Sequence, residues 1–166
     1  ASGAGTALVH ELRQQTAAVL AGEPVSVEQA PKQLAFNAIP QIDVFGEDGY
    51  TKEETKMVNE SRKILHTPDL AISATCVRIP TLVSHAVAVH VALDRPLDPA
   101  EARELWAGQD GVSVVDNPLN SSYPTPLEST AQDDVFVGRV TSASPRPSVM
   151  VQLPGRPQHV GSFPLF

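Results

Sequence analysis

The chain has 166 residues, of which 42% are hydrophobic and 19% charged, and its 12 basic and 19 acidic residues give a formal net charge of −7. This length is sufficient for a domain with its own hydrophobic core. The basic residues are scattered along the sequence, and an excess of negative charge repels phosphate backbones and anionic lipid. We therefore expect neither nucleic-acid binding nor membrane binding.

The cysteine and histidine content bears on the compartment and on metal binding. Cys76 is the single cysteine and cannot form an intramolecular disulfide, which is typical of the reducing cytoplasm. No apolar run is long enough to span a bilayer, and the first residues lack the pattern of a signal peptide. No spacing of histidines and cysteine resembles a metal site. We therefore expect a cytoplasmic protein without a bound metal.

The first part of the chain combines a glycine-rich turn with two predicted helices. Residues 1–5 form the turn, which leads into a predicted helix over residues 6–20. Because such turns normally follow a strand, we expect further sequence upstream. The capping box Thr51-Lys52-Glu53-Glu54 predicts the start of a second helix, which should end near His66, before Pro68.

Strands dominate the rest of the chain. The predicted strands lie at residues 71–79, 84–93, 112–115 and 134–140, with an irregular or edge strand at 34–45. Asp98 and Pro99 are typical of a helix start, and that helix should run to about Ala107. Helices mixed with hairpin-linked strands predict an α+β fold, in which helices cover a mainly antiparallel sheet.

The composition changes near residue 140. Residues 1–140 are predicted to form one domain, whereas residues 141–166 are rich in proline and show no sustained periodicity. This tail is predicted to be either disordered or extended along the body of the domain.

Four charged or titratable side chains could act together in a site. Glu53 and Lys56 are three residues apart in the first turns of a helix and share a face, although a solvated ion pair would show the same spacing. A hairpin folded near Thr81 would place Arg78 opposite His85. Arginine suits a carboxylate and histidine transfers protons near neutral pH. Alternatively, Arg78 pairs with a surface acid and His85 only ends a strand.

Two further features carry weaker signals. The turn Ser2-Gly3-Ala4-Gly5 could present backbone N–H groups to a ligand at a helix N-terminus, or its glycines could serve turn geometry alone. Cys76 lies in an apolar, β-rich run, so we expect a packed thiol rather than a nucleophile.

Several short motifs are each weak, but their order and spacing together are specific for one protein family. The chain contains, in order, SGAG at 2–5, LAFNAIPQID at 34–43, EETK at 53–56, NESRKIL at 59–65, TCVRIP at 75–80, YPTP at 123–126 and DVFVGR at 134–139. With His85 seven residues after Arg78, this series resembles the aspartate-semialdehyde dehydrogenase family over residues 1–140. The resemblance implies the C-terminal catalytic and dimerisation domain, which is similar to the C-terminal domain of glyceraldehyde-phosphate dehydrogenase.

The resemblance also implies an activity and roles for residues. Members of the family reversibly convert L-aspartate 4-semialdehyde, phosphate and NADP to 4-aspartyl phosphate and NADPH, on the diaminopimelate route to lysine and the routes to methionine and threonine. By resemblance, His85 is the acid and base and Arg78 binds the substrate carboxylate. Glu53 binds the substrate ammonium, and Lys56 binds the phosphate.

The resemblance further implies what surrounds this chain. Ser2 and Gly3 match the turn that approaches the nicotinamide end of NADP, whereas the nucleophilic cysteine and the dinucleotide loop belong to an N-terminal Rossmann domain that this sequence lacks. We therefore expect a homodimer or homotetramer in the family context, and an inactive chain when it is alone. Two alternatives are a free dimerisation module without catalysis and an N-acetylglutamyl-phosphate reductase. Glu53 argues against the reductase, since an acetylated nitrogen carries no ammonium.

Overall fold

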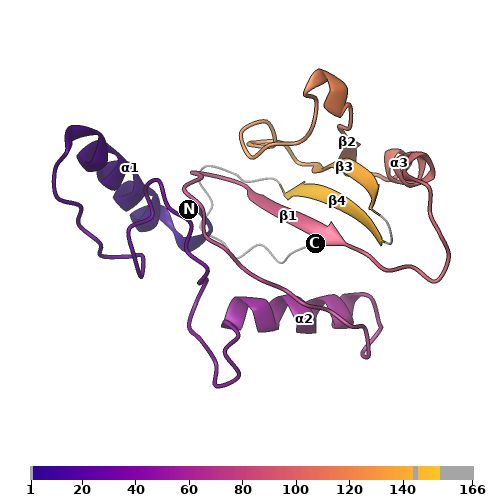
Figure 1. Ribbon diagram of the computed structural model, residues 1–166, viewed down its shortest axis with the longest axis horizontal. Coiled ribbons are helices and arrows are strands. Elements are labelled where there is room, and N and C mark those ends of the chain that lie inside the picture. The colour runs from indigo at the N-terminus through magenta and orange to yellow at the C-terminus, as the bar shows by residue number, and fades with distance from the viewer. Residues whose placement is uncertain (1, 144–145, 154–166) are drawn as a thin grey trace. The chain divides into compact units, whose positions relative to one another are not determined.

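The computed structural model describes residues 2–143 and 146–153, which form two compact units. The first unit contains Thr6–Pro80, and the second contains Ser2–Gly5 together with the described residues from Thr81 onward. In chain order the elements are η1 (Ser2–Ala4), α1 (Thr6–Ala21), α2 (Lys52–Ile64), β1 (His85–His90), α3 (Pro99–Ala107), β2 (Val112–Val114), η2 (Pro118–Asn120), β3 (Val135–Ala143) and β4 (Arg146–Leu153) (Figure 1). The predicted α+β class is confirmed.

The first unit has its core between α1 and the irregular chain that follows it. The buried apolar side chains are Leu8, Leu12, Ala30, Leu34, Ala35 and Ile39. α1 ends at a glycine in the left-handed region, Gly22, whose φ is 71°. The N–H of Gly22 donates to the carbonyl of Val19, and the N–H of Glu23 donates to that of Ala18. Gly22 thus turns the chain back along the helix.

Helix α2 begins as its capping box predicts. The Thr51 hydroxyl accepts the N–H of Glu54 at 3.3 Å, and Oε2 of Glu54 accepts the N–H of Thr51 at 2.8 Å. Arg62 and Lys63 lie in the last turn, where cations favour the negative end of the helix dipole. The helix therefore starts at the expected residue and ends two residues before the predicted His66.

The predicted hairpin between residues 71–79 and 84–93 is wrong. Arg78 instead forms an isolated antiparallel bridge with Ile39, in which each N–H donates to the other carbonyl at 2.8 and 2.9 Å. No strand is assigned over residues 71–79 or 34–45, although Phe45 forms a second isolated bridge with Thr51. The backbone of Arg78 is thus occupied within the first unit, and β1 pairs with another strand.

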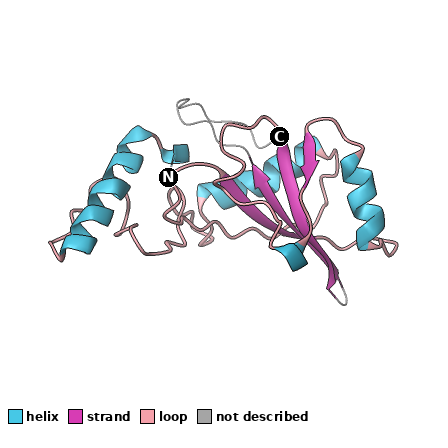
Figure 2. Cartoon of the chain, turned by 90° about the horizontal axis from the view of Figure 1, so that it is seen from above, coloured by secondary structure: helices cyan, strands magenta, loops and turns pink. Residues whose placement is uncertain are grey.

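The second unit is built on a four-stranded sheet with the order β1-β4-β3-β2 (Figures 1 and 2). β4 pairs antiparallel with both β1 and β3, whereas β2 and β3 are parallel. Helix α3 packs against β2 and β3. Since β4 covers Arg146–Leu153, this part of the proline-rich stretch is extended and paired rather than disordered. The division into a domain at 1–140 and a tail at 141–166 stays a prediction, and residues 154–166 lie outside the described residues.

A bulge interrupts the pairing of β3 with β4 between Gly138 and Thr141. At Gly138 a Cβ would overlap the carbonyl oxygen of Val115 and would lie 2.5 Å from Cδ of Pro124, so only glycine fits. Asp116 accepts the N–H groups that the bulge leaves free, from Arg139 at 2.8 Å and from Val140 at 3.1 Å. The bulge is therefore supported by a side chain from outside both strands.

Candidate functional site

The N-terminal turn of α2 carries two of the predicted site residues. Nζ of Lys56 lies 3.8 Å from Oε1 of Glu53, and the side chains are 38% and 30% exposed, respectively. Both line a pocket of about 430 Å³. Its other lining residues are Asp43, Gly46, Tyr50, Lys52, Thr55 and Asn59. Because the two charged groups are 3.8 Å apart and both side chains are partly exposed, each group can also contact a ligand.

Arg78 belongs to the same unit and is half-buried. Burial lowers the pKa of its guanidinium, while the carboxylate of Glu53 acts in the opposite direction. Arginine remains a cation in proteins, so the side chain offers a forked hydrogen-bond donor. The first unit therefore contains an anion, a compact cation and a forked cation, and the bridge partner of Arg78 is Ile39.

Glu54 joins the two segments that carry these residues. Its Oε2 accepts the N–H of Thr51 and its Oε1 accepts the N–H of Cys76, both at 2.8 Å. These two backbone hydrogen bonds lower the pKa of the carboxyl group. The sequence predicted only the first contact, since a capping box is local and the partner Cys76 lies 22 residues away.

Cys76 is buried and its Sγ lies 3.4 Å from Sδ of Met57. Burial, together with the carboxylates of Glu54 and Glu53, raises the pKa of the thiol to about 11. Since the thiolate is the nucleophilic form, both the burial and the raised pKa of Cys76 disfavour its reaction near neutral pH. This agrees with the expected packed thiol.

His85 lies in the second unit, as the first residue of β1. The preceding Ser84 is buried with φ of 66°, and the hydroxyl of the fully buried Ser129 donates to its Oγ at 3.2 Å. Gly3 lies against the imidazole, since a Cβ at this glycine would be 3.0 Å from Cε1 of His85. The turn at the start of the chain and His85 are thus neighbours, 82 residues apart in sequence.

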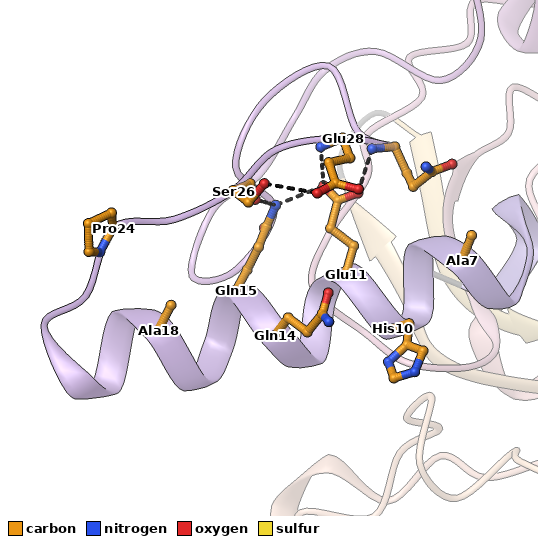
Figure 3. Close-up of a pocket in the computed structure, with 10 residues that line it drawn as sticks. Ala7, His10, Glu11, Gln14, Gln15, Ala18, Pro24, Ser26 and Glu28 are labelled. Atoms are coloured by element: carbon orange, nitrogen blue, oxygen red, sulfur yellow. Dashed lines mark hydrogen bonds between the residues drawn. The ribbon is translucent and has the colours of Figure 1, made fainter.

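A second pocket, of about 500 Å³, lies between α1 and the segment that follows it (Figure 3). Glu11 and Gln15 extend from the helix toward this segment, and the Gln15 amide donates to Oε1 of Glu11 at 2.8 Å. Glu11 also accepts the N–H of Glu28, while Oε1 of Gln15 accepts that of Leu34. Because these polar atoms are used within the unit, they hold the loop on the helix rather than a ligand.

Among the described residues 2–143 and 146–153, no group of three or more His, Cys, Asp or Glu side chains could hold a metal ion. No helix in this part of the chain is both long and apolar enough to cross a membrane.

Comparison with known proteins places the chain in a family. Residues 1–152 match the family model for the semialdehyde dehydrogenase dimerisation domain. Aspartate-semialdehyde dehydrogenase from Aquifex aeolicus is 46% identical over 140 residues, which are 84% of this chain and 41% of that protein. The Bacillus subtilis enzyme is 44% identical over 147 residues, which cover 84% and 42%. The chain thus spans about two fifths of the length of these relatives.

Solved structures agree with this assignment. Aspartate semialdehyde dehydrogenase II from Vibrio cholerae superposes with a TM-score of 0.84 at 39% identity, over 91% of this chain and 45% of that chain. The structure of the same enzyme complexed with ASA gives the same values. The Francisella tularensis enzyme gives a TM-score of 0.79 at 30% identity, over 91% and 49%. The chain therefore belongs to the family of semialdehyde dehydrogenase dimerisation domains.

Proposed function

We propose that this chain is the substrate-binding and dimerisation domain of an NADP-dependent aspartate-semialdehyde dehydrogenase. The enzyme would convert L-aspartate 4-semialdehyde, phosphate and NADP reversibly to 4-aspartyl phosphate and NADPH, in the biosynthesis of lysine, methionine and threonine. The observation that carries the proposal is the presence of Glu53, Lys56 and Arg78 in one unit, with two of them on one helical turn. Membership of the family supports it.

The chemistry of the substrate matches these three side chains. Arg78 would bind the α-carboxylate through its guanidinium fork, which is suited to two parallel hydrogen bonds. Glu53 would bind the α-ammonium through its carboxylate, which is partly exposed and lies 3.8 Å from Nζ of Lys56. Lys56 would bind phosphate as a compact positive charge. Each charged group of the semialdehyde, and the phosphate, would thus have a partner of opposite charge.

His85 would act as base, accepting the proton of the attacking thiol or of the hydroxyl group formed on the carbonyl oxygen, and then as acid, returning a proton to the thiolate that phosphate displaces. The turn at Ser2 and Gly3 would receive the nicotinamide end of NADP, which accepts the hydride when it is bound. Gly3 lies against the imidazole of His85, which supports placing this turn beside the proposed acid and base. The nucleophile is proposed to be a cysteine in an N-terminal Rossmann domain, since Cys76 is protonated near neutral pH.

The proposed function also implies a compartment, an oligomeric state and a second domain. We place the enzyme in the cytoplasm, where a free cysteine stays reduced. We propose a homodimer or homotetramer, in keeping with the description of the matched family as a dimerisation domain. Since the chain matches about 41% of the Aquifex aeolicus relative, the rest of the catalytic site would come from the remaining part of such a protein.

The test compares the 166-residue chain with the same chain joined to the N-terminal part of the Aquifex aeolicus relative. Phosphate-dependent formation of NADPH from L-aspartate 4-semialdehyde is expected only in the joined protein. His85→Ala should lower kcat by about 10²-fold or more, which is the usual contribution of a general acid and base. His90→Ala is the matched control, because His90 is also exposed on β1 and should leave kcat unchanged.

Three outcomes would contradict the proposal. Activity of the chain alone would place the nucleophile within it. An equal loss in the His85→Ala and His90→Ala proteins would remove the special role of His85. A joined protein that folds and dimerises without activity would instead favour a dimerisation module.

A further inference from the structure

We infer that Glu54 is a positioning residue, which fixes Arg78 relative to Glu53 and Lys56. This inference rests on the proposed function, because it concerns how the three side chains proposed to bind substrate and phosphate are kept at fixed positions relative to one another. The first turn of α2 carries Glu53 and Lys56, whereas Arg78 lies on a segment without regular secondary structure. The isolated bridge with Ile39 holds Arg78 from one side, and it does not connect this segment to α2.

The carboxylate of Glu54 provides the connection. One oxygen accepts the N–H of Thr51 at the start of α2, and the other accepts the N–H of Cys76, two residues before Arg78. Arg78 is held in turn by its two backbone hydrogen bonds with Ile39. The segment from 76 to 78 is thus attached to the α2 N-terminus on one side and to Ile39 on the other.

A helix cap alone does not account for this arrangement. A capping box needs only the reciprocal contact between Thr51 and Glu54, which occupies one carboxylate oxygen. The second oxygen is used on a backbone group 22 residues away, and Glu54 is only 7% exposed. A carboxylate is required here, because both oxygens face N–H donors and an amide offers only one acceptor oxygen.

The same contacts separate the roles of two adjacent acids. Glu54 directs its carboxylate to two backbone donors, and its side chain is buried. Glu53 keeps a partly exposed carboxylate that faces Lys56. Of these two adjacent acids, only Glu53 therefore offers its carboxylate to an incoming ammonium group.

The experiment uses the 166-residue chain labelled with ¹⁵N and compares the wild type with Glu54→Gln and Thr51→Val. Thr51→Val is the matched control: it removes the hydroxyl cap but keeps the N–H of Thr51 and both oxygens of Glu54. In the wild type, the Cys76 amide signal should shift as Glu54 is titrated with acid and should be protected from hydrogen exchange. Glu54→Gln should abolish the titration and reduce the protection, whereas Thr51→Val should preserve both.

Binding of L-aspartate 4-semialdehyde to the same three proteins supplies the functional readout. Glu54→Gln should raise the dissociation constant by about tenfold, the loss expected when a charged hydrogen-bonding group such as Arg78 is displaced from its partner. The dissociation constant of Thr51→Val should stay within about twofold of the wild-type value, since this change keeps the contact between Glu54 and Cys76.

The outcomes separate this inference from the function on which it rests. If the wild type binds the semialdehyde and Glu54→Gln binds it equally well, the inference is overturned and the proposed substrate stands. An equal weakening in Thr51→Val and Glu54→Gln would show that helix stability alone matters, which also overturns the inference. Absence of binding by the wild type would overturn the proposed substrate, and with it this role of Glu54.

Discussion

Replacement of Asp116 by asparagine should destabilise the second unit strongly. The side chain of Asp116 is 1% exposed and accepts three N–H groups. Two come from the backbone of the β3 bulge, at Arg139 and Val140, and the third is Nε of Arg103 at 2.6 Å. Asparagine has nearly the same shape, so the change removes charge and one acceptor without opening a cavity.

The expected loss follows from these contacts. The asparagine amide group would face an N–H donor, and leaving a buried donor unsatisfied costs about 1–3 kcal/mol. The Arg139 contact is exposed and the Val140 contact is part-buried, so this contribution should lie near the lower end of that range. The ion pair with Arg103 is lost as well, and breaking a buried pair typically costs about 3–5 kcal/mol in total. Because the Arg103 side chain is 35% exposed and can turn to water, we expect the lower end, about 3 kcal/mol.

Urea unfolding measures this loss through the fluorescence of Trp106, the single tryptophan, which packs against the core of the second unit. Asp110→Asn is the control, since Asp110 is exposed and a surface change should alter the free energy of unfolding by less than about 0.5 kcal/mol. A loss below about 1 kcal/mol for Asp116→Asn would refute the reasoning, because it would mean that the bulge finds other acceptors.

Three further predictions concern stability and reactivity. Gly138→Ala should lower the free energy of unfolding by about 2 kcal/mol or more, since its Cβ would overlap the carbonyl of Val115, whereas Gly108→Ala, with 3.7 Å to its nearest atom, should be tolerated in the same urea titration. The pKa of Glu54 is lowered in the folded state, so its contribution is present above about pH 4.5 and is lost as the pH falls through the folded pKa. The difference in unfolding free energy between the wild type and Glu54→Gln should therefore shrink in acid, and a constant difference would contradict this. With its pKa raised to about 11, Cys76 should react with a thiol reagent at pH 7 only after denaturation, so rapid labelling of the native chain would contradict its burial.

The sequence determined those features that depend on neighbouring residues. The Thr51 and Glu54 capping box and the cap at Asp98 both form as their spacing predicts, since a cap needs only a side chain and the next turn of backbone. The residues of the candidate site were predicted from the motifs, and their roles stay a prediction. Their partners within one helical turn, such as Glu53 and Lys56, followed from the helical period.

The burial of polar side chains was harder to predict from the sequence. Glu11 and Gln15 lie on the inner face of α1 and are 6% and 2% exposed, although such residues usually face water. They are buried because backbone N–H groups of a later loop satisfy them. The partner is a stretch of backbone, which carries no signal in the sequence.

Only the tertiary structure decided which backbone edges pair. Residues 71–79 and 84–93 looked like a hairpin, yet Arg78 pairs with Ile39 and β1 pairs with β4. β4, from the proline-rich stretch, lies between β1 and β3. Side-chain alternation shows that a segment can be extended, but its partner depends on which donors and acceptors remain free after the rest of the chain has folded. That competition extends over the whole chain, and local spacing therefore cannot settle it.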